Sequence, residues 1–133
     1  MLAGRGSVAR LAADLAAVSR ADHVVDVGCG PGTAAREAAR RGARVTGVDP
    51  ATVMLRLARV LTRDRAAIDW VGGTAERLPQ HDASATVVWS LATVHHWTDV
   101  TAGLAEARGV LVAGGRFLAI ERLVRPAAGR SAG

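Results

Sequence analysis

The stretch V-V-D-V-G-C-G-P-G, residues 24–32, decides the fold of this chain. An apolar run with one acid, Asp26, passes into glycines at alternate positions, and a helix-forming segment follows. Glycine suits a turn that needs unusual backbone angles and that lets the backbone approach a ligand closely. The stretch therefore predicts a strand, a tight turn and the start of a helix, with backbone N–H groups open to a bound molecule.

Length and composition predict one cytoplasmic domain. At 133 residues the chain has room for one hydrophobic core. No apolar stretch approaches the roughly 20 residues that span a bilayer, and Arg and Asp interrupt the Ala/Leu pattern of the first 20 residues, which therefore does not resemble a secretory signal. Cys29 is the single cysteine, so no internal disulfide can form, which favours a reducing compartment.

The net charge of +5 rests on 17 arginines, because the chain has no lysine. The absence of lysine excludes a P-loop, a pyridoxal Schiff base and a lysine general base. The arginines gather in residues 36–44 and 56–65, at spacings typical of the outer faces of two helices. No aromatic side chain is interleaved among them to stack on bases, so a solvated surface is favoured over a nucleic-acid site.

Apolar strands alternate with helical patterns along the chain. Strands are expected at residues 23–27, 44–48, 67–71, 85–90 and 116–121, and helices at residues 7–18, 33–41, 49–63 and 99–112. Local signals add Ser7 as an N-cap, Gly42 as a left-handed C-cap, Pro50 at a first helical position and a turn at Gly114-Gly115. This order predicts an α/β fold of three layers, in which a doubly wound, Rossmann-like and mostly parallel sheet carries helices on both faces.

Polar residues follow several of these strands, and in such folds ligands bind at the carboxyl ends of the strands, near the point where strand order reverses. Asp49 lies about 20 residues beyond the glycine turn, where an acid can accept both hydroxyls of a ribose. Asp49 can also cap the helix that Pro50 begins, and the two roles are compatible. A nicotinamide dinucleotide is the rival ligand, but its G-x-G-x-x-G fingerprint needs glycine where this chain has Thr33.

The spacing here is G-x-G-x-G, and further segments follow in order: V-T-G-V-D-P with A-T-V-M-L, G-T-A-E-R-L-P, V-V-W-S-L and R-G-V-L-V-A-G-G-R-F-L. In these motifs the chain resembles the catalytic core of the class I S-adenosylmethionine-dependent methyltransferases, of the small-molecule, type 11-like kind. The resemblance covers about residues 24–121. We therefore divide the chain into an N-terminal helix in residues 1–22, an S-adenosylmethionine-binding core in residues 23–121 and a flexible tail in residues 122–133.

The resemblance implies S-adenosylmethionine as the cofactor and gives roles to the matching residues. Asp26 would orient the glycine turn and, through that turn or a water, the amino group of the methionine moiety. Gly28 and Gly30 would let the methionine part lie against the backbone, and Asp49 would take the ribose. Many relatives carry Asp where Thr74 stands, which weakens the implied contact with the adenine amine. The resemblance also implies that Met54, Thr74, Ala75 and Glu76 frame the adenine and that the Ser90 carbonyl accepts from its amino group. The other implied cofactor-site residues are Cys29 (a small buried filler), Gly32, Pro50 and Leu91.

The reaction needs little covalent help, because a sulfonium methyl is already activated and transfer needs mainly alignment and exclusion of water. His95 and His96, past the fourth strand, stand where an acceptor would approach. They act as a base or acceptor contact, or else cap the next helix and pack with Trp97. The chain lacks both a D/N-P-P-Y/F signature after strand four and a Pro-Cys pair. By analogy with methyltransferases of quinone precursors, a small-molecule acceptor is predicted, and no metal site.

The family's sheet normally has seven strands, and strands six and seven are not recognisable in the 12 residues after Glu121. Strand five would then be an exposed edge, through which the chain can self-associate. Two other functions stay open. One is a module that binds S-adenosylmethionine or its demethylated product without turnover, and the other is an Arg-rich nucleic-acid methyltransferase or binder.

Overall fold

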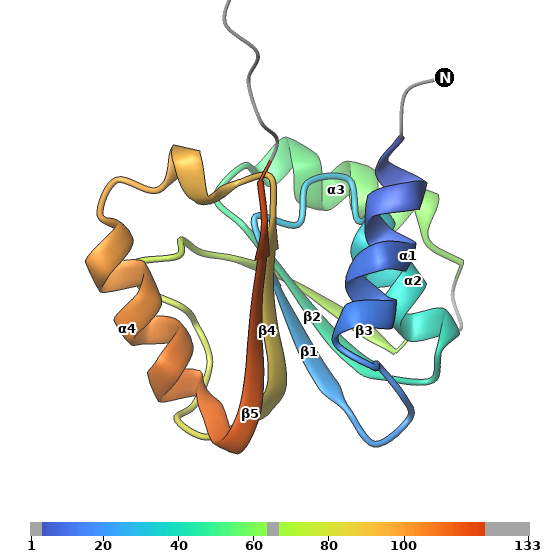
Figure 1. Ribbon diagram of the computed structural model, residues 1–133. Helices are drawn as coiled ribbons and strands as arrows, with labels where there is room; N and C mark the ends of the chain where they lie inside the picture. The colour runs from blue at the N-terminus through green and yellow to red at the C-terminus, as the bar shows by residue number, and fades with distance from the viewer. Residues whose placement is uncertain (1–3, 64–66, 122–133) are drawn as a thin grey trace, which may run out of the picture.

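Five strands form the central sheet of the computed structural model, which describes residues 4–63 and 67–121 (Figure 1). Neighbouring strands run parallel, in the order β3-β2-β1-β4-β5. Their bounds are β1 His23–Val27, β2 Arg44–Asp49, β3 Ile68–Gly72, β4 Ala85–Leu91 and β5 Leu111–Ile120. The predicted α/β fold with a parallel, doubly wound sheet is confirmed, whereas the predicted tail at residues 122–133 lies outside the described residues.

β1 is the middle strand of the sheet, because it pairs with β2 on one side and with β4 on the other. Val24 and Val25 are fully buried in two different clusters of the core, since successive side chains of a strand point to opposite faces. Such near-continuous apolar strands are typical of a parallel sheet that is covered on both faces. The apolar half of the stretch at residues 24–32 is thus the centre of the core.

Helices cover both faces of the sheet (Figure 1). α1 and α2 pack on the face that holds Val24, and α4 packs on the face that holds Val25. α3 lies against β3 and β2. None of the helices in the described residues has the length and apolar character that crossing a bilayer requires. The bounds are α1 Arg5–Leu15, α2 Thr33–Arg40, α3 Thr52–Leu61 and α4 Val100–Val110, with a short 3-10 helix, η1, at Val94–His96.

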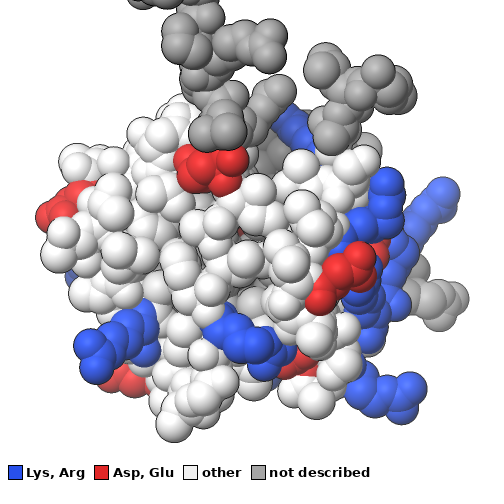
Figure 2. All heavy atoms as spheres, in the orientation of Figure 1, with Lys and Arg blue, Asp and Glu red and all other residues white. Residues whose placement is uncertain are grey.

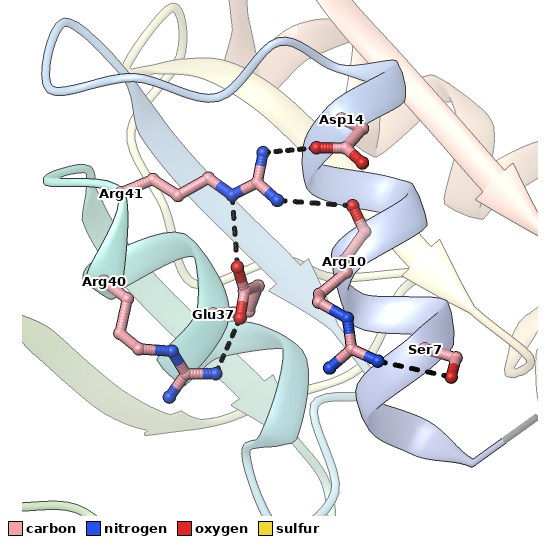
Figure 3. Close-up of polar contacts among 6 residues, drawn as sticks. All are labelled: Ser7, Arg10, Asp14, Glu37, Arg40 and Arg41. Atoms are coloured by element: carbon pink, nitrogen blue, oxygen red, sulfur yellow. Dashed lines mark hydrogen bonds and ion pairs between the residues drawn. The ribbon is translucent and has the colours of Figure 1, made fainter.

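α1 packs against α2 through small residues. A network of charged groups also joins the two helices (Figure 3). Arg41 Nη1 lies 2.7 Å from Asp14 Oδ1 on α1, and Arg41 Nε lies 3.1 Å from Glu37 Oε2 on α2. Arg40 Nη2 lies 2.7 Å from the other oxygen of Glu37. This network holds α1 in the position that brings its first turn to the candidate site. The small residues are completely buried, and they are Ala12, Ala13, Ala35 and Ala38.

The limits of α1 differ from the predicted helix at residues 7–18. The helix begins after Gly4, and Ser7 lies inside it rather than at its N-cap. It ends early because Ala17 adopts the left-handed conformation, with a φ of 51°, and closes a Schellman-type cap. Alanine gives no sequence signal for that conformation, since glycine is the usual residue there. The predicted cap at Gly42 is confirmed, with a φ of 91° at the end of α2.

The starts of α3 and β5 also differ from the prediction. The Ala51 N–H donates a hydrogen bond to Asp49 Oδ1 at 2.8 Å, so the chain turns there and α3 begins at Thr52, past Pro50. α4 passes into β5 without an intervening turn. Gly114-Gly115 instead belongs to a bulge in β5, where the register shifts between its pairings with Ala85 and Val87 of β4.

A buried carboxylate, Asp22, lies directly before β1 and joins β4 and β5 to the segment that follows α1. Thr86 Oγ1 on β4 and Arg116 Nη2 on β5 donate hydrogen bonds to Asp22 Oδ1 at 2.8 and 2.9 Å. The Ser19 N–H donates to Oδ2 at 2.9 Å, and Arg116 Nε donates to the Ala16 carbonyl at 2.9 Å. Burial alone would raise the pKa of Asp22, but the hydrogen bonds from Ser19, Thr86 and Arg116 outweigh it and hold the pKa below its usual value.

Replacing Asp22 with Asn is expected to destabilise the fold by about 1–3 kcal/mol at neutral pH, because hydrogen bonds to a charged group are lost. Since the pKa is lowered in the folded state, this stabilisation is complete above the unfolded-state pKa of about 3.9 and is lost as the pH falls below it. Urea unfolding of both proteins over this range measures the effect. The two stability curves should converge on the acid side, and a constant difference at every pH would contradict the assignment.

Candidate active site

A cavity of about 650 Å³ opens at the carboxyl ends of β1 and β4, where the strand order reverses. The glycine turn after β1 forms part of its wall through Gly28 and Gly30, and the segment after β4 forms another part. The first turn of α1 contributes Val8, and the end of β5 contributes Ile120. The cavity thus lies where the strand-end rule places a ligand, between segments that are distant in the sequence.

The glycine turn is bonded to the end of β2. The N–H groups of Gly28 and Cys29 donate to the Val48 carbonyl at 2.8 and 2.9 Å. The Gly30 N–H donates to Asp49 Oδ2 at 2.9 Å. The prediction that these N–H groups are open to a ligand is therefore wrong, because the neighbouring strand already uses them.

The first turn of α2 offers donors in their place. Thr33 and Ala34 line the cavity at the start of this helix. The first N–H groups of an α-helix have no acceptor within the helix, and the helix dipole adds positive potential at this end. This part of the wall therefore favours a negatively charged group.

The glycines of the turn are needed for different reasons. A Cβ on Gly28 would lie 2.8 Å from the Thr93 side chain, so this glycine makes room for the segment after β4. Gly32, with a φ of 91°, makes room in the same way for Trp70 on β3. A Cβ on Gly30 would meet nothing within 4 Å, and Gly30 lines the cavity. Gly30 is thus the glycine whose missing side chain leaves space for a ligand.

Asp26 is a buried carboxylate on the cavity wall. It is 2% exposed, and within the described residues neither its Oδ2 nor Trp89 Nε1 has a hydrogen-bond partner. Burial raises the pKa of Asp26 to about 7, the Trp89 N–H offsets part of that rise without reaching hydrogen-bond geometry, and the charge of Asp49 adds to it. A buried polar atom without a partner costs about 1–3 kcal/mol. Oδ2 itself has almost no exposed surface, so a ligand with N–H donors would reach it only through a small shift of the side chain.

Asp49 ends β2 and is 8% exposed. Its Oδ2 accepts from the Gly30 N–H at 2.9 Å, and its Oδ1 accepts from the Ala51 N–H at 2.8 Å. A carboxylate has about four lone-pair sites, so each oxygen can accept a further hydrogen bond. Asp49 therefore holds the turn and the start of α3, and its oxygens keep capacity for a ribose, although Asp49 itself is not among the residues that line the cavity. Pro50, beside it, is exposed.

The residues expected to frame an adenine do not line the cavity. Met54 is half-buried on α3, Thr74 is exposed after β3, and Ala75 is buried in the core on the side of α4. Glu76 Oε2 accepts a hydrogen bond from the Asp99 N–H at 3.0 Å, at the start of α4. The structure therefore does not join this group to the glycine turn in one cavity.

The segment after β4 packs against the glycine turn. Ser90 is fully buried, and its hydroxyl is hydrogen-bonded to the Thr93 hydroxyl. Thr93 Oγ1 also donates to the Val27 carbonyl at 3.1 Å. Leu91 and Ala92 line the cavity, and Ala92 holds a left-handed backbone with a φ of 62°. Sequence reasoning missed Thr93, for which a hydroxyl three positions past Ser90 was a weak signal.

The two histidines past this segment have different surroundings. His95 lines the cavity, and its Nδ1 lies 2.9 Å from Oε1 of Glu121, the residue that follows β5. His96 is exposed, with its ring centroid 4.0 Å from that of His95. Trp97 packs over Gly103 of α4, where an added Cβ would collide with the indole. Sequence reasoning missed Glu121, although an acid at the carboxyl end of strand five is what the strand-end rule seeks.

Cys29 is a buried filler. It is 7% exposed, and burial raises the pKa of its thiol well above the usual value. A neutral thiol is a poor nucleophile and a poor metal ligand. Across residues 4–63 and 67–121, no group of three or more His, Cys, Asp or Glu side chains is placed to hold a metal ion.

Comparison with known proteins assigns this arrangement to a family. A family model described as a methyltransferase domain matches residues 25–119, which is most of the sheet and the whole of the glycine turn. The chain belongs to the class I S-adenosylmethionine-dependent methyltransferases.

The chain spans about half the length of the relatives and solved structures that it matches. It is 36% identical to the ubiquinone/menaquinone biosynthesis C-methyltransferase of Rubrivivax gelatinosus over 107 residues, which are 80% of this chain and 42% of that protein. The YcgJ protein of Bacillus subtilis superposes with a TM-score of 0.80 at 27% identity, over 86% of this chain and 50% of that one. The [4+2]-cyclase SpnF shares the fold, with a TM-score of 0.81 at 24% identity, over 93% of this chain and 48% of that one.

Alanine at two glycines of the turn is expected to separate steric from backbone effects. Gly28→Ala places a Cβ 2.8 Å from Thr93 at a φ of 74°, and should lower the free energy of unfolding by more than about 2 kcal/mol. Gly30→Ala carries the backbone cost alone, about 1–2 kcal/mol, because its Cβ meets open space. Urea unfolding measures both variants. Equal losses would contradict the different roles assigned to the two glycines.

Proposed function

We propose that the cavity binds S-adenosylmethionine and that this chain transfers the methyl group to a small-molecule acceptor. One observation carries the proposal, namely that the cavity lies where the strand order reverses between β1 and β4 and is lined there by Asp26 and by Gly30, whose missing side chain leaves it open. Membership in the methyltransferase family supports it. When bound, the sulfonium supplies an activated methyl group, so the protein needs mainly to align the reactants and exclude water.

Three parts of the chain would hold the cofactor. Asp26 would accept a hydrogen bond from the amino group of the methionine part, directly or through a water. The first turn of α2 would face the carboxylate of that part. Asp49 would accept the ribose hydroxyls with the lone pairs that the backbone leaves free. The adenine contacts of Met54, Thr74, Ala75, Glu76 and Ser90, none of which lines the cavity, stay predictions, as does a cofactor contact of Leu91, which does line it.

A small acceptor is favoured over a nucleic acid because two of the clustered arginines are already paired with acidic side chains of the protein. Figure 2 shows basic side chains gathered on the side of the molecule where α1 and α2 lie in Figure 1. Arg40 and Arg41 in this region are paired with Glu37 and Asp14, which gives them a structural role. The cavity lining also includes apolar side chains, such as Val8 of α1 and Ile120 of β5, which suit a small organic molecule.

Isothermal titration calorimetry with S-adenosylhomocysteine and with NAD tests the proposed cofactor. The wild type should bind the first ligand and not the second. Asp49→Ala should weaken binding at least tenfold, since a hydrogen bond to a charged acceptor contributes about 1.5–3 kcal/mol. Gly30→Ala, which leaves every side-chain contact in place, should also weaken binding because its methyl group enters the cavity. Binding of NAD alone, or of neither ligand, would refute the proposal.

The affinity should depend on pH through Asp26. Burial raises the pKa of Asp26 to about 7, so the carboxyl is largely protonated at mildly acidic pH and must ionise to receive a cationic amino group. The affinity for S-adenosylhomocysteine should therefore rise from about pH 5.5 to about pH 7, by at most about tenfold per pH unit. Asp26→Asn should remove this rise. Calorimetry at several pH values measures it, and a flat wild-type profile would argue against the contact.

A second candidate function is binding without turnover. Formation of a methylated product from S-adenosylmethionine separates the two functions.

β5 is the last strand of the sheet, and among the described residues no strand pairs with its outer edge. Self-association through that edge and a cytoplasmic location stay predictions.

A further inference from the structure

An imidazole and a carboxylate meet on the cavity wall, and the cofactor contacts proposed above use neither. His95 Nδ1 lies 2.9 Å from Glu121 Oε1, and the His95 backbone N–H donates to the same oxygen at 3.4 Å. His95 belongs to η1, after β4, whereas Glu121 follows β5. Both line the cavity, so the ends of two neighbouring strands bring this pair to the space where a ligand would lie.

The pair determines which ring nitrogen of His95 carries the proton. Burial would raise the pKa of Glu121, but hydrogen bonds from the His95 ring, the His95 N–H and the Val94 N–H outweigh it and lower the pKa. An ionised carboxylate can only accept hydrogen bonds, so Nδ1 must be the donor. In the neutral ring Nε2 then keeps its lone pair. Within the described part of the chain, Nε2 makes no hydrogen bond that would occupy this lone pair.

The contact between His95 and Glu121 contributes little to the stability of the fold. The side chains of His95 and Glu121 are 59% and 36% exposed, and an exposed ion pair contributes about 0–1 kcal/mol. His96 provides a comparison within the same short helix. Its ring lies 4.0 Å from that of His95, centroid to centroid, yet it does not line the cavity. The pair is thus placed where ligand chemistry can use it.

We propose that His95 Nε2 accepts a proton from the methyl acceptor and that Glu121 is the positioning residue that keeps His95 in the required tautomer. The inference rests on the proposed function and adds an acceptor class to it. The class is a compound with a phenol-type hydroxyl, because such a proton, with a pKa of about 10, can pass to an imidazole far more readily than that of an aliphatic alcohol.

The proton and charge balance of the step suits this pair. The hydroxyl oxygen gives its proton to His95 Nε2 and uses an electron pair to bond the methyl carbon. The S–CH₃ bond breaks with its electron pair left on sulfur, which becomes a neutral thioether. The positive charge that the sulfonium loses therefore ends on the imidazolium of His95, beside the negative charge of Glu121.

Other charged groups border the same cavity. Arg5 from α1 and Asp26 from β1 line it, and His96 lies beside His95. Glu121 is the one among them that is hydrogen-bonded to the His95 ring. Its removal should therefore change the tautomer of His95 more than a change at Arg5 or Asp26.

NMR of the histidine nitrogens in the free protein tests the positioning role without any cofactor. Above neutral pH the wild type should show His95 with its proton on Nδ1. Glu121→Ala should lose this preference and Glu121→Asp should keep part of it, while the signals of His96 stay unchanged. A proton on Nε2 of His95 in the wild type, or the same tautomer in Glu121→Ala, would overturn the proposal.

Turnover tests the catalytic role, with phenol, catechol and 4-hydroxybenzoate as probes under saturating S-adenosylmethionine. A methylated product is expected from the wild type. His95→Gln should lower kcat by about 10²–10⁴-fold, without changing the affinity for S-adenosylhomocysteine. Glu121→Ala should lower kcat by a smaller factor, whereas His96→Gln should stay within about twofold of the wild type.

Calorimetry distinguishes failure of the proposed base from failure of the proposed cofactor. A protein that binds S-adenosylhomocysteine but methylates none of the three phenols, or whose His95→Gln variant keeps its kcat, overturns this inference and leaves the proposed cofactor in place. A protein that does not bind S-adenosylhomocysteine overturns the proposed function, and with it the catalytic role of His95.

Discussion

The hydrogen bonds between the glycine turn and the end of β2 are the constraint on which the candidate site depends. The Val48 carbonyl and the Asp49 carboxylate together accept the N–H groups of three consecutive residues, 28–30. Backbone donors and acceptors that are buried must find partners, and here each finds one in the neighbouring strand. Asp49 is therefore part of the scaffold before any ligand arrives. The carboxylate that would receive a ribose also sets the position of the wall beside it.

Packing around this turn explains why several of its residues must be small. Gly28 yields space to Thr93, and Gly32 and Gly47 yield space to the ring of Trp70. Glycine therefore serves contacts between neighbouring segments at these positions. Gly30 differs, because the space that it leaves belongs to the cavity. The glycines of one motif thus have two functions in the structure, because Gly28 and Gly32 allow close packing and Gly30 leaves space in the cavity.

The positions of the strands along the chain follow from local patterns, and for that reason the sequence predicts them well. Apolar runs, the glycine turn and the cap at Gly42 each act within a few residues. The left-handed backbone of Ala17 could not be predicted, because alanine gives no signal for it. The bonded state of the turn N–H groups depends on Val48 in another strand, and the contact of His95 with Glu121 depends on the docking of β5 beside β4. Such long-range contacts have no signature in a single sequence.

The central claim is that the cavity between the glycine turn and the segment after β4 binds S-adenosylmethionine. Backbone amide NMR during a titration with S-adenosylhomocysteine tests it most directly. The account predicts shifts concentrated at Gly30, Thr33 and Ala92, with little change at Leu104 and Phe117 in the groove between α4 and β5. Shifts centred on that groove, or no shifts at saturating ligand, would contradict it.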